Sequence, residues 1–305
     1  MQAGEQHVRV NQDTRLNFRV LDLRTSHSIT SWKCKAFHLN FILKSLTYSC
    51  FVEIHTPKLI AGSSEGGAAV FRLGYKGHPA CLIQSPHLHR QMAICADFGR
   101  DFEISPAFSA EDSFTHRHLC EFPGLDVEME IKKHYYEIMD KVDRLFVSIF
   151  DSLNQNCKKA LEAVHIFVRL CSLHMKKGFR CSRYGTEFYI LYWYPLAVRP
   201  FYTRSCYDEE IISGAQCVHN AEMLKNRLSL AALMSRRYLH TFIISGILHG
   251  PLLGSSCHIH CFFVYGAPTH RGFGVGLELV VMLFYSLNNI RKTSFYLGNP
   301  LRIAP

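Results

Sequence analysis

The stretch FEISPAFSAEDSFTHRHLCEFPGLDVEMEI, residues Phe102–Ile131, carries the pattern on which the fold of this chain depends. Phe102–Ile104 alternates between apolar and charged side chains, and we expect this strand to end at Pro106. From Leu125 to Ile131 the alternation resumes, with apolar side chains at the odd-numbered positions and carboxylates at the even-numbered ones. The pattern predicts two strands of an antiparallel sheet, with one face buried and the other lined by carboxylates.

The loop between these two strands, Ser109–His118, is dense in titratable side chains. It holds two acidic residues, two histidines and an arginine: Glu111, Asp112, His116, Arg117 and His118. Such a loop can hold its charges over a binding site, or it can be the solvated tip of an ordinary hairpin. The pattern alone leaves both interpretations open.

Three stretches resemble the signature motifs of one enzyme family. Phe102–Ile131 is similar to motif 2 of class II aminoacyl-tRNA synthetases, in the form found in eukaryotic cytosolic aspartyl-tRNA synthetases. Phe51–Phe71, FVEIHTPKLIAGSSEGGAAVF, resembles motif 1 and the mobile loop that follows it, and Gly272–Leu283, GFGVGLELVVML, resembles motif 3. Their order and spacing fit, and nearly the whole chain can be placed against the catalytic domain of that family. The resemblance implies an enzyme, an ATP-dependent aspartate–tRNA ligase.

The same resemblance implies a fold and domain boundaries. We expect an α/β (α+β) architecture, the class II catalytic domain, in which an antiparallel sheet is flanked by helices. Residues 1–24 would be the remnant of a linker from a missing anticodon-binding domain, and residues 25–305 the catalytic domain, with internal deletions near 166–184 and 206–209. Apolar periodicity predicts helices over Ile131–Leu153 and Leu277–Leu287.

ATP and Mg²⁺ are the cofactors that the resemblance implies. Glu210 and Ser213 would supply oxygen ligands to the magnesium, which is a hard cation. Glycines of motif 3 would let the backbone approach the nucleotide closely. The residues expected to bind ATP are Ser109, Glu111, Arg117, His118, Leu119, Glu210, Gly274, Gly276, Glu278 and Leu279.

Aspartate would be held by a second set of residues from the same resemblance. Family members carry glutamine at the position of His87 and lysine at that of Arg90, and an arginine there could still pair with a carboxylate through two hydrogen bonds. The residues expected to bind aspartate are Glu65, His87, Arg90, Asp126, Ser213 and Cys217.

The expected catalytic positions are Ser109, Glu111 and Leu279. At Ser109, Cys217 and Leu279 the family has arginines, which neutralise phosphate charge or pair with the substrate carboxylate. A hydroxyl, a thiol and an aliphatic side chain carry no such charge, so we expect the activity to be impaired. Two alternatives follow: a non-catalytic protein that binds tRNA or a synthetase partner, or a decayed paralogue without function.

Composition agrees with a globular protein that binds a polyanion. The 305 residues are 48% hydrophobic and 19% charged, with a formal net charge of +9, which suits RNA. The resemblance, rather than the composition, implies tRNA(Asp) and L-aspartate as partners, a homodimer, and association with a larger synthetase complex, but no DNA. Twelve cysteines without a secretory signal indicate reduced thiols in the cytoplasm. No apolar run is long enough for a membrane helix.

Overall fold

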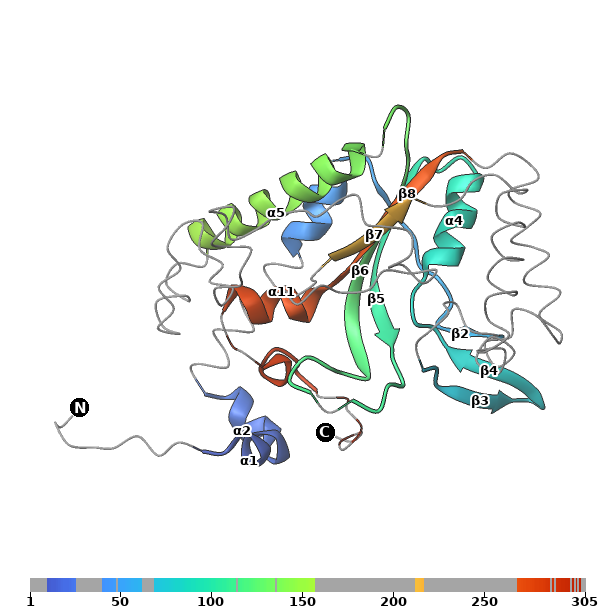
Figure 1. The fold of residues 1–305 in the computed structure, drawn as a ribbon. Helices are drawn as coiled ribbons and strands as arrows, with labels where there is room; N and C mark the ends of the chain where they lie inside the picture. The colour runs from blue at the N-terminus through green and yellow to red at the C-terminus, as the bar shows by residue number, and fades with distance from the viewer. Residues whose placement is uncertain are drawn as a thin grey trace, which may run out of the picture.

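Alternating strands build a five-stranded sheet at the centre of the structure (Figure 1). We describe the protein from a computed structural model, which describes residues 10–25, 40–47, 49–61, 69–113, 115–134, 136–156, 212–216, 268–285, 287, 289–296, 298, 300 and 302. The strands lie in the order β1 (Val52–Glu53), β5 (Arg100–Phe108), β6 (Glu121–Glu130), β8 (His270–Gly276) and β7 (Ile212–Gln216). β1 runs parallel to β5, and the other neighbouring pairs are antiparallel.

A smaller, three-stranded antiparallel sheet lies beside the first (Figure 1). Its order is β2 (Leu59–Ile60), β4 (His78–Leu82) and β3 (Arg72–Tyr75). The turn between β3 and β4 has φ of 50° at Lys76 and 80° at Gly77. Positive φ at both central residues is the backbone of a two-residue hairpin turn that matches strand twist, which explains the glycine there.

Helices cover both faces of the large sheet (Figure 1). On one side lie α5 (Tyr136–Asn156), α11 (Leu277–Phe284) and a helical segment at residues 40–47. On the other side α4 (His87–Cys95) packs against β5, β6 and β8. The chain begins its described part with two short helices, α1 (Gln12–Asn17) and α2 (Arg19–Leu23), and a 3₁₀ turn, η3 (Ile290–Lys292), lies near its end.

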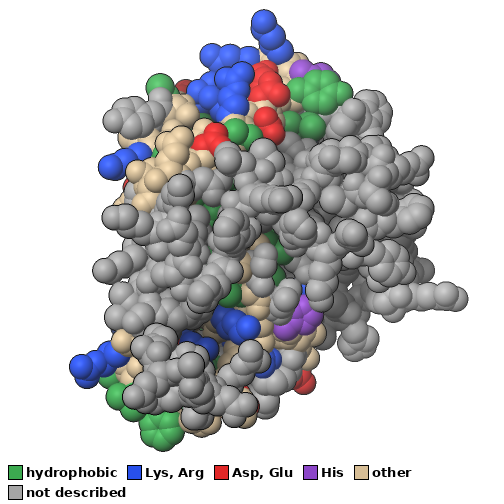
Figure 2. Space-filling model, turned by 90° about the vertical axis from the view of Figure 1, so that its left-hand side faces the viewer, with side chains coloured by type: hydrophobic (Ala, Val, Ile, Leu, Met, Phe, Trp, Pro, Cys, Tyr) green, Lys and Arg blue, Asp and Glu red, His purple; other side chains and the backbone are tan. Residues whose placement is uncertain are grey.

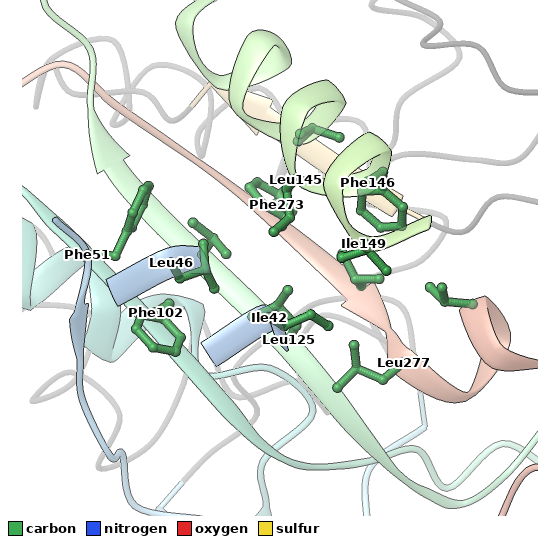
Figure 3. Close-up of a cluster of buried hydrophobic side chains, with 14 of the residues drawn as sticks. Ile42, Leu46, Phe51, Phe102, Leu125, Leu145, Phe146, Ile149, Phe273 and Leu277 are labelled. Atoms are coloured by element: carbon green, nitrogen blue, oxygen red, sulfur yellow. The ribbon is translucent and has the colours of Figure 1, made fainter. Parts of the chain in front are cut away.

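The main hydrophobic core lies between the sheet and the helices α5 and α11 (Figure 3). Leu125, Val127 and Met129 of β6 lie in it, as the alternation predicts, and Phe273 and Val275 of β8 join them. Phe102 is fully buried at the centre of this layer. The labelled side chains converge from four parts of the chain: Ile42, Leu46, Phe51, Phe102, Leu125, Leu145, Phe146, Ile149, Phe273 and Leu277.

A second, smaller cluster joins the two ends of the described chain. Its buried members are Leu16 of α1, Leu119, Met282 of α11 and Ile290 of η3. Nearby, the Arg19 side chain donates hydrogen bonds to the carbonyls of Ser294 and Phe295. The first helices are therefore held against the C-terminal segment.

The surface shown in Figure 2 carries mixed charge rather than one basic field among the described residues. Lysine and arginine side chains lie beside acidic ones at the upper end of that face, and hydrophobic side chains reach the surface at its lower end (Figure 2). Within the described ranges, no helix is both long and apolar enough to cross a membrane.

The prediction that Pro106 ends the first strand is wrong. β5 continues to Phe108, and Pro106 lies directly opposite Pro123 of β6. Neither proline has an N–H, but in a non-hydrogen-bonded antiparallel pair no N–H is needed between the two strands. Pro106 also lies past the last residue of β5 that pairs with β1, so its missing N–H breaks no bond between these two strands.

Three helix boundaries also differ from the expectation, and one of them is the end of α5, which lies at Asn156 rather than at Leu153. α5 begins at Tyr136 rather than at Ile131, because the Glu137 carboxylate accepts hydrogen bonds from the backbone N–H groups of Lys133 and His134, at 2.6 and 3.1 Å. α11 ends at Phe284 rather than at Leu287, where the Leu287 N–H donates back to the carbonyl of Met282. Bonds of this kind close a helix.

Candidate active site

The face of the large sheet opposite the main core is polar. Across neighbouring strands, Glu103 of β5 is paired with Asp126 of β6, Asp126 with Gly274 of β8, and Gly274 with Ser213 of β7. Residues directly opposite each other in antiparallel strands share a face. The next row along the strands is Asp101, Glu128, Gly272 and Ala215. The predicted carboxylate-lined face is confirmed.

Two glycines of β8 leave room for the carboxylates of β6. A β-carbon placed on Gly272 would meet the Glu128 carboxylate and would lie 2.6 Å from the carbonyl oxygen of Val127. A β-carbon on Gly274 would lie 3.2 Å from Oδ1 of Asp126. Any side chain at these positions would displace the acidic groups, so the glycines are what allows the carboxylates of β6 to lie over β8.

Helix α4 supplies a buried guanidinium to this face. Arg90 is 1% exposed and Asp101 is fully buried. Nε of Arg90 donates to Oδ1 of Asp101 at 2.7 Å, and Nη2 donates to both Oδ1 and the carbonyl oxygen of Asp101. Nη1 donates to the carbonyl oxygen of Asp126. One side chain of α4 thus ties β5 and β6 together.

Burial raises the pKa of Asp101 to about 6, although the neighbouring Arg90 guanidinium acts in the opposite direction.

One helical turn earlier on α4, Nδ1 of His87 lies 3.0 Å from Oε2 of Glu128. Nε2 of His87 lies 3.0 Å from the side-chain amide of Gln91. His87 therefore bridges α4 and the carboxylate that lies over Gly272.

Glu103 is held from the motif 1 side. Lys58 Nζ lies 2.5 Å from Oε1 of Glu103, and the Thr56 hydroxyl donates to Oε2 at 2.8 Å. Burial favours a raised pKa for Glu103, but the hydrogen bonds from Lys58 and Thr56 outweigh it and hold this pKa below its ordinary value. Burial lowers the pKa of the nearby His89, and the positive charge of Lys58 adds to that shift.

The motif 2 loop adds a cluster of polar side chains at the open end of the β5–β6 pair. Oε2 of Glu111 lies 3.5 Å from Nε2 of His118, and both side chains are about half exposed, at 43% each. Nδ1 of His118 lies within hydrogen-bonding distance of the Ser113 and Thr115 hydroxyls, at 3.1 and 2.5 Å. The Ser109 N–H donates to the carbonyl of Cys120, which closes the base of the loop.

Leu279 of α11 lies against apolar neighbours. It packs against the cluster that contains Leu119 and Met282. Its Cδ1 would be 3.2 Å from a β-carbon at Gly276, so its side chain folds back over the end of β8. Glu278, the residue before it, is buried.

The structure brings most of the described candidates to one region. His87, Arg90, Asp126, Gly274 and the backbone of Ser213 lie on or against the polar face. Gly276 faces Gly124 at the end where the motif 2 loop departs, which associates Ser109, Glu111, Arg117, His118 and Leu119 with the same end of the sheet. Glu65, Glu210 and Cys217 lie outside the described residues, as do the proposed deletion points.

Three residues on this face were absent from the predicted site: Asp101, Glu103 and Lys58. The charge pairs they form join positions 11 and 45 residues apart, and alternation along a single strand carries no information about such partners. Glu128 was predicted to face the same side as Asp126, but its pairing with His87 could not be found without the position of α4.

Comparisons with known proteins give the family of the chain. A family model described as tRNA synthetases class II (D, K and N) matches residues 11–299. The chain is 48% identical to "Aspartate--tRNA ligase 2, cytoplasmic" of Arabidopsis thaliana, over 100% of this chain and 60% of that protein. It is 38% identical to "Aspartate--tRNA ligase, cytoplasmic" of Homo sapiens, over 99% of this chain and 67% of that protein.

A solved structure gives the same result for the fold. The chain superimposes on a putative aspartyl-tRNA synthetase from Leishmania major with a TM-score of 0.79 and 29% sequence identity, covering 100% of this chain and 72% of that one. The alignment with the Arabidopsis protein extends over 356 positions, more than the 305 residues of this chain, and the chain spans only about three-fifths of that relative. The chain belongs to the class II tRNA synthetase family that comprises the D, K and N enzymes.

Proposed function

We propose that this chain carries the catalytic unit of an aspartate–tRNA ligase, which activates L-aspartate with ATP and transfers it to the 3′ end of tRNA(Asp). The observation that carries the proposal is the row formed by Asp126, Gly274 and Ser213 across three strands. It places a carboxylate, which suits the substrate ammonium, beside a backbone that a nucleotide can approach closely. The relatives in Arabidopsis thaliana and Homo sapiens are named as aspartate–tRNA ligases, which supports aspartate as the amino acid.

Each part of the face has a role in this proposal. Asp126, with Glu65, would hold the ammonium group of aspartate. Glu111 on the motif 2 loop would accept from the adenine amino group, since its carboxylate is half exposed at the open end of the sheet. Gly274 and Gly276 would border the nucleotide. Positioning of this kind provides most of the rate in phosphoryl and acyl transfer.

Magnesium fits the residues proposed for it. Oxygen donors such as Glu210 and Ser213 suit a hard divalent cation, and the register places Ser213 opposite Gly274, next to the proposed nucleotide position. Bound there, the ion would neutralise phosphate charge. The chain's own residues would orient it and the substrate.

The rate of this enzyme should be low. Leu279 stands where the resemblance expects an arginine, and its apolar neighbours leave that position without positive charge. The loss of one such arginine can cost on the order of 10³ in rate. The same observation favours a second candidate function, a synthetase-like protein that binds tRNA or a partner without catalysis.

Aspartate-dependent exchange of pyrophosphate into ATP tests the first function. We expect a weak signal that depends on aspartate and rises at least tenfold in the Ser109→Arg variant, which restores one charge at the base of the motif 2 loop. A chain that is folded by circular dichroism and shows no exchange with or without that change would refute the catalytic proposal. A salt-dependent shift of tRNA(Asp) under the same conditions would then support the binding function.

Assembly and location follow from the same family. We propose a homodimer formed through the motif 1 region and membership of a larger synthetase complex. We also propose a cytoplasmic location, which the names of the relatives state for those proteins. Sedimentation of the purified chain over a range of concentrations would test the dimer.

A further inference from the structure

We infer that Arg90 is a positioning residue, which fixes Asp126 in place, and that it does not contact the side-chain carboxylate of the amino acid substrate. The inference rests on the proposed function, because it concerns how that substrate is recognised. It assigns discrimination of the substrate side chain to other groups on the same face.

The first support is that the guanidinium is already occupied. Nε and Nη2 of Arg90 both donate to Asp101, and Nη1 donates to the carbonyl oxygen of Asp126. A substrate carboxylate binds arginine best through two parallel N–H groups. These four bonds use four of the five N–H groups, and the one that remains, on Nη1, has no second N–H beside it with which to form such a pair.

The second support is burial. The Arg90 side chain is 1% exposed and its partner Asp101 is 0% exposed. A ligand that accepted two parallel bonds from Arg90 would have to displace the carboxylate or the carbonyl oxygen of Asp101, and this would leave a buried acceptor without its donor. Breaking a buried pair in this way is strongly unfavourable, so competition by a small substrate is not expected.

The third support is the direction in which Arg90 acts. Its Nη1 bond ends on the backbone of Asp126, whose side chain lies on the proposed substrate face opposite Gly274. Its other bonds end on Asp101 of β5. Arg90 therefore sets the position of Asp126 relative to β5 and α4, and any effect on the substrate passes through Asp126.

Lysine, which the resemblance places at this position in family members, could not reproduce this arrangement. An ammonium is a single point donor, whereas Arg90 spans two residues on two strands with a planar fork. Arg90→Lys is therefore the informative variant. It keeps the charge and removes the fork. Arg144, an exposed residue of α5, provides the matched control in Arg144→Lys.

The test compares two stable adenylate analogues, the aspartyl and the alanyl sulfamoyl adenosines, by isothermal titration. They differ in the side-chain carboxylate. The variant for this measurement is Arg90→Met combined with Asp101→Asn, which removes the guanidinium and the charge of its buried partner together, because a lysine could itself pair with the substrate carboxylate. If Arg90 is a positioning residue, the double variant weakens both analogues by the same factor, and the ratio of the alanyl to the aspartyl dissociation constant changes by less than about twofold. If Arg90 binds the substrate carboxylate, the ratio falls by about tenfold or more, the value of a charged hydrogen bond, and the inference is overturned.

Hydrogen exchange without any ligand gives a second measurement. Amides of β6 around Asp126 should exchange faster in Arg90→Lys than in the wild type, and Arg144→Lys should leave them unchanged. Equal exchange in Arg90→Lys and wild type would overturn the positioning role. If the wild type binds neither analogue, the proposed function fails, and the exchange at β6 still decides the role of Arg90.

Discussion

Substitution of Gly272 by alanine should destabilise the fold, because the added β-carbon would collide with two groups of β6. The added β-carbon would lie 2.6 Å from the Val127 carbonyl oxygen and 2.7 Å from Cδ of Glu128. Carbon atoms do not approach this closely, so a strand or a side chain must move. The Val127 carbonyl belongs to the backbone of β6, and Glu128 is held by His87 at 3.0 Å. Neither neighbour can give way freely.

Overpacking of this kind costs about 1–3 kcal/mol in the free energy of unfolding. The lower conformational entropy of an unfolded chain with alanine offsets about 0.4–1 kcal/mol of that. We therefore expect Gly272→Ala to lose about 1–2 kcal/mol, measured by urea denaturation. Gly74→Ala on β3 is the control, because nothing lies within 4 Å of a β-carbon there, and it should change the free energy by less than about 0.5 kcal/mol.

A double-mutant cycle shows whether Glu128 is the obstacle. In a His87→Ala background Glu128 loses one of the contacts that hold it, so the loss from Gly272→Ala should shrink by about 1 kcal/mol, with the remainder due to the Val127 carbonyl and the other restraints on Glu128. If Gly272→Ala proves as stable as the wild type, or if its loss is the same with and without His87, the described packing of this face is wrong.

Three further predictions concern the ionic and apolar contacts. The pKa of Asp101 is raised to about 6 in the folded protein, so its contribution to stability should be complete below about pH 4 and should be lost as the pH rises to about 6. Across that window the free energy of unfolding should fall by on the order of 2–3 kcal/mol relative to that of Asp101→Asn. A difference between the two proteins that does not change with pH would contradict this. In thermal melts, Lys58→Met should lower the free energy of unfolding by about 1–3 kcal/mol, because it leaves the Glu103 carboxylate without its cation. Lys44→Met, at an exposed helical position, should leave that free energy unchanged. Leu119→Ala should cost about 2–5 kcal/mol, since Leu119 is 5% exposed in the smaller core, and unfolding at an unchanged urea concentration would argue against that cluster.

The sheet was predictable where one strand decides its own faces. From Leu125 to Ile131 the alternation placed apolar side chains in the core and carboxylates opposite them, and the structure confirms both. Pro106 misled because a proline was taken to end a strand. A proline ends a strand only where a neighbouring strand would need an N–H at that position. This depends on the register with β6 and β1.

The start of α5 could not be placed from apolar periodicity. Ile131 is buried like a helix residue of the stripe, yet its N–H donates to the carbonyl of Thr269 and belongs to the sheet. The capping role of Glu137 decides the boundary instead. A glutamate two positions inside a helix is common, and only its hydrogen bonds show that it caps.

The polar face was found as a set of residue types, and its connections were not. Asp126 and Gly274 were expected near a substrate, and the register brings them opposite each other. The partner of Arg90 lies on β5 and the partner of His87 lies on β6, both of which follow α4 in the chain. Electrostatic pairing across such distances depends on where α4 packs, which no local pattern records.

The opposed prolines at the tip of β5 and β6 bear on how this protein avoids unwanted association. Pro106 is exposed, and neither it nor Pro123 can donate a hydrogen bond to an incoming strand. A foreign β-strand seeking to extend the sheet along this arm would find gaps in the ladder on both outer edges. The arm that carries the motif 2 loop can thus project from the sheet with little risk of templating aggregation.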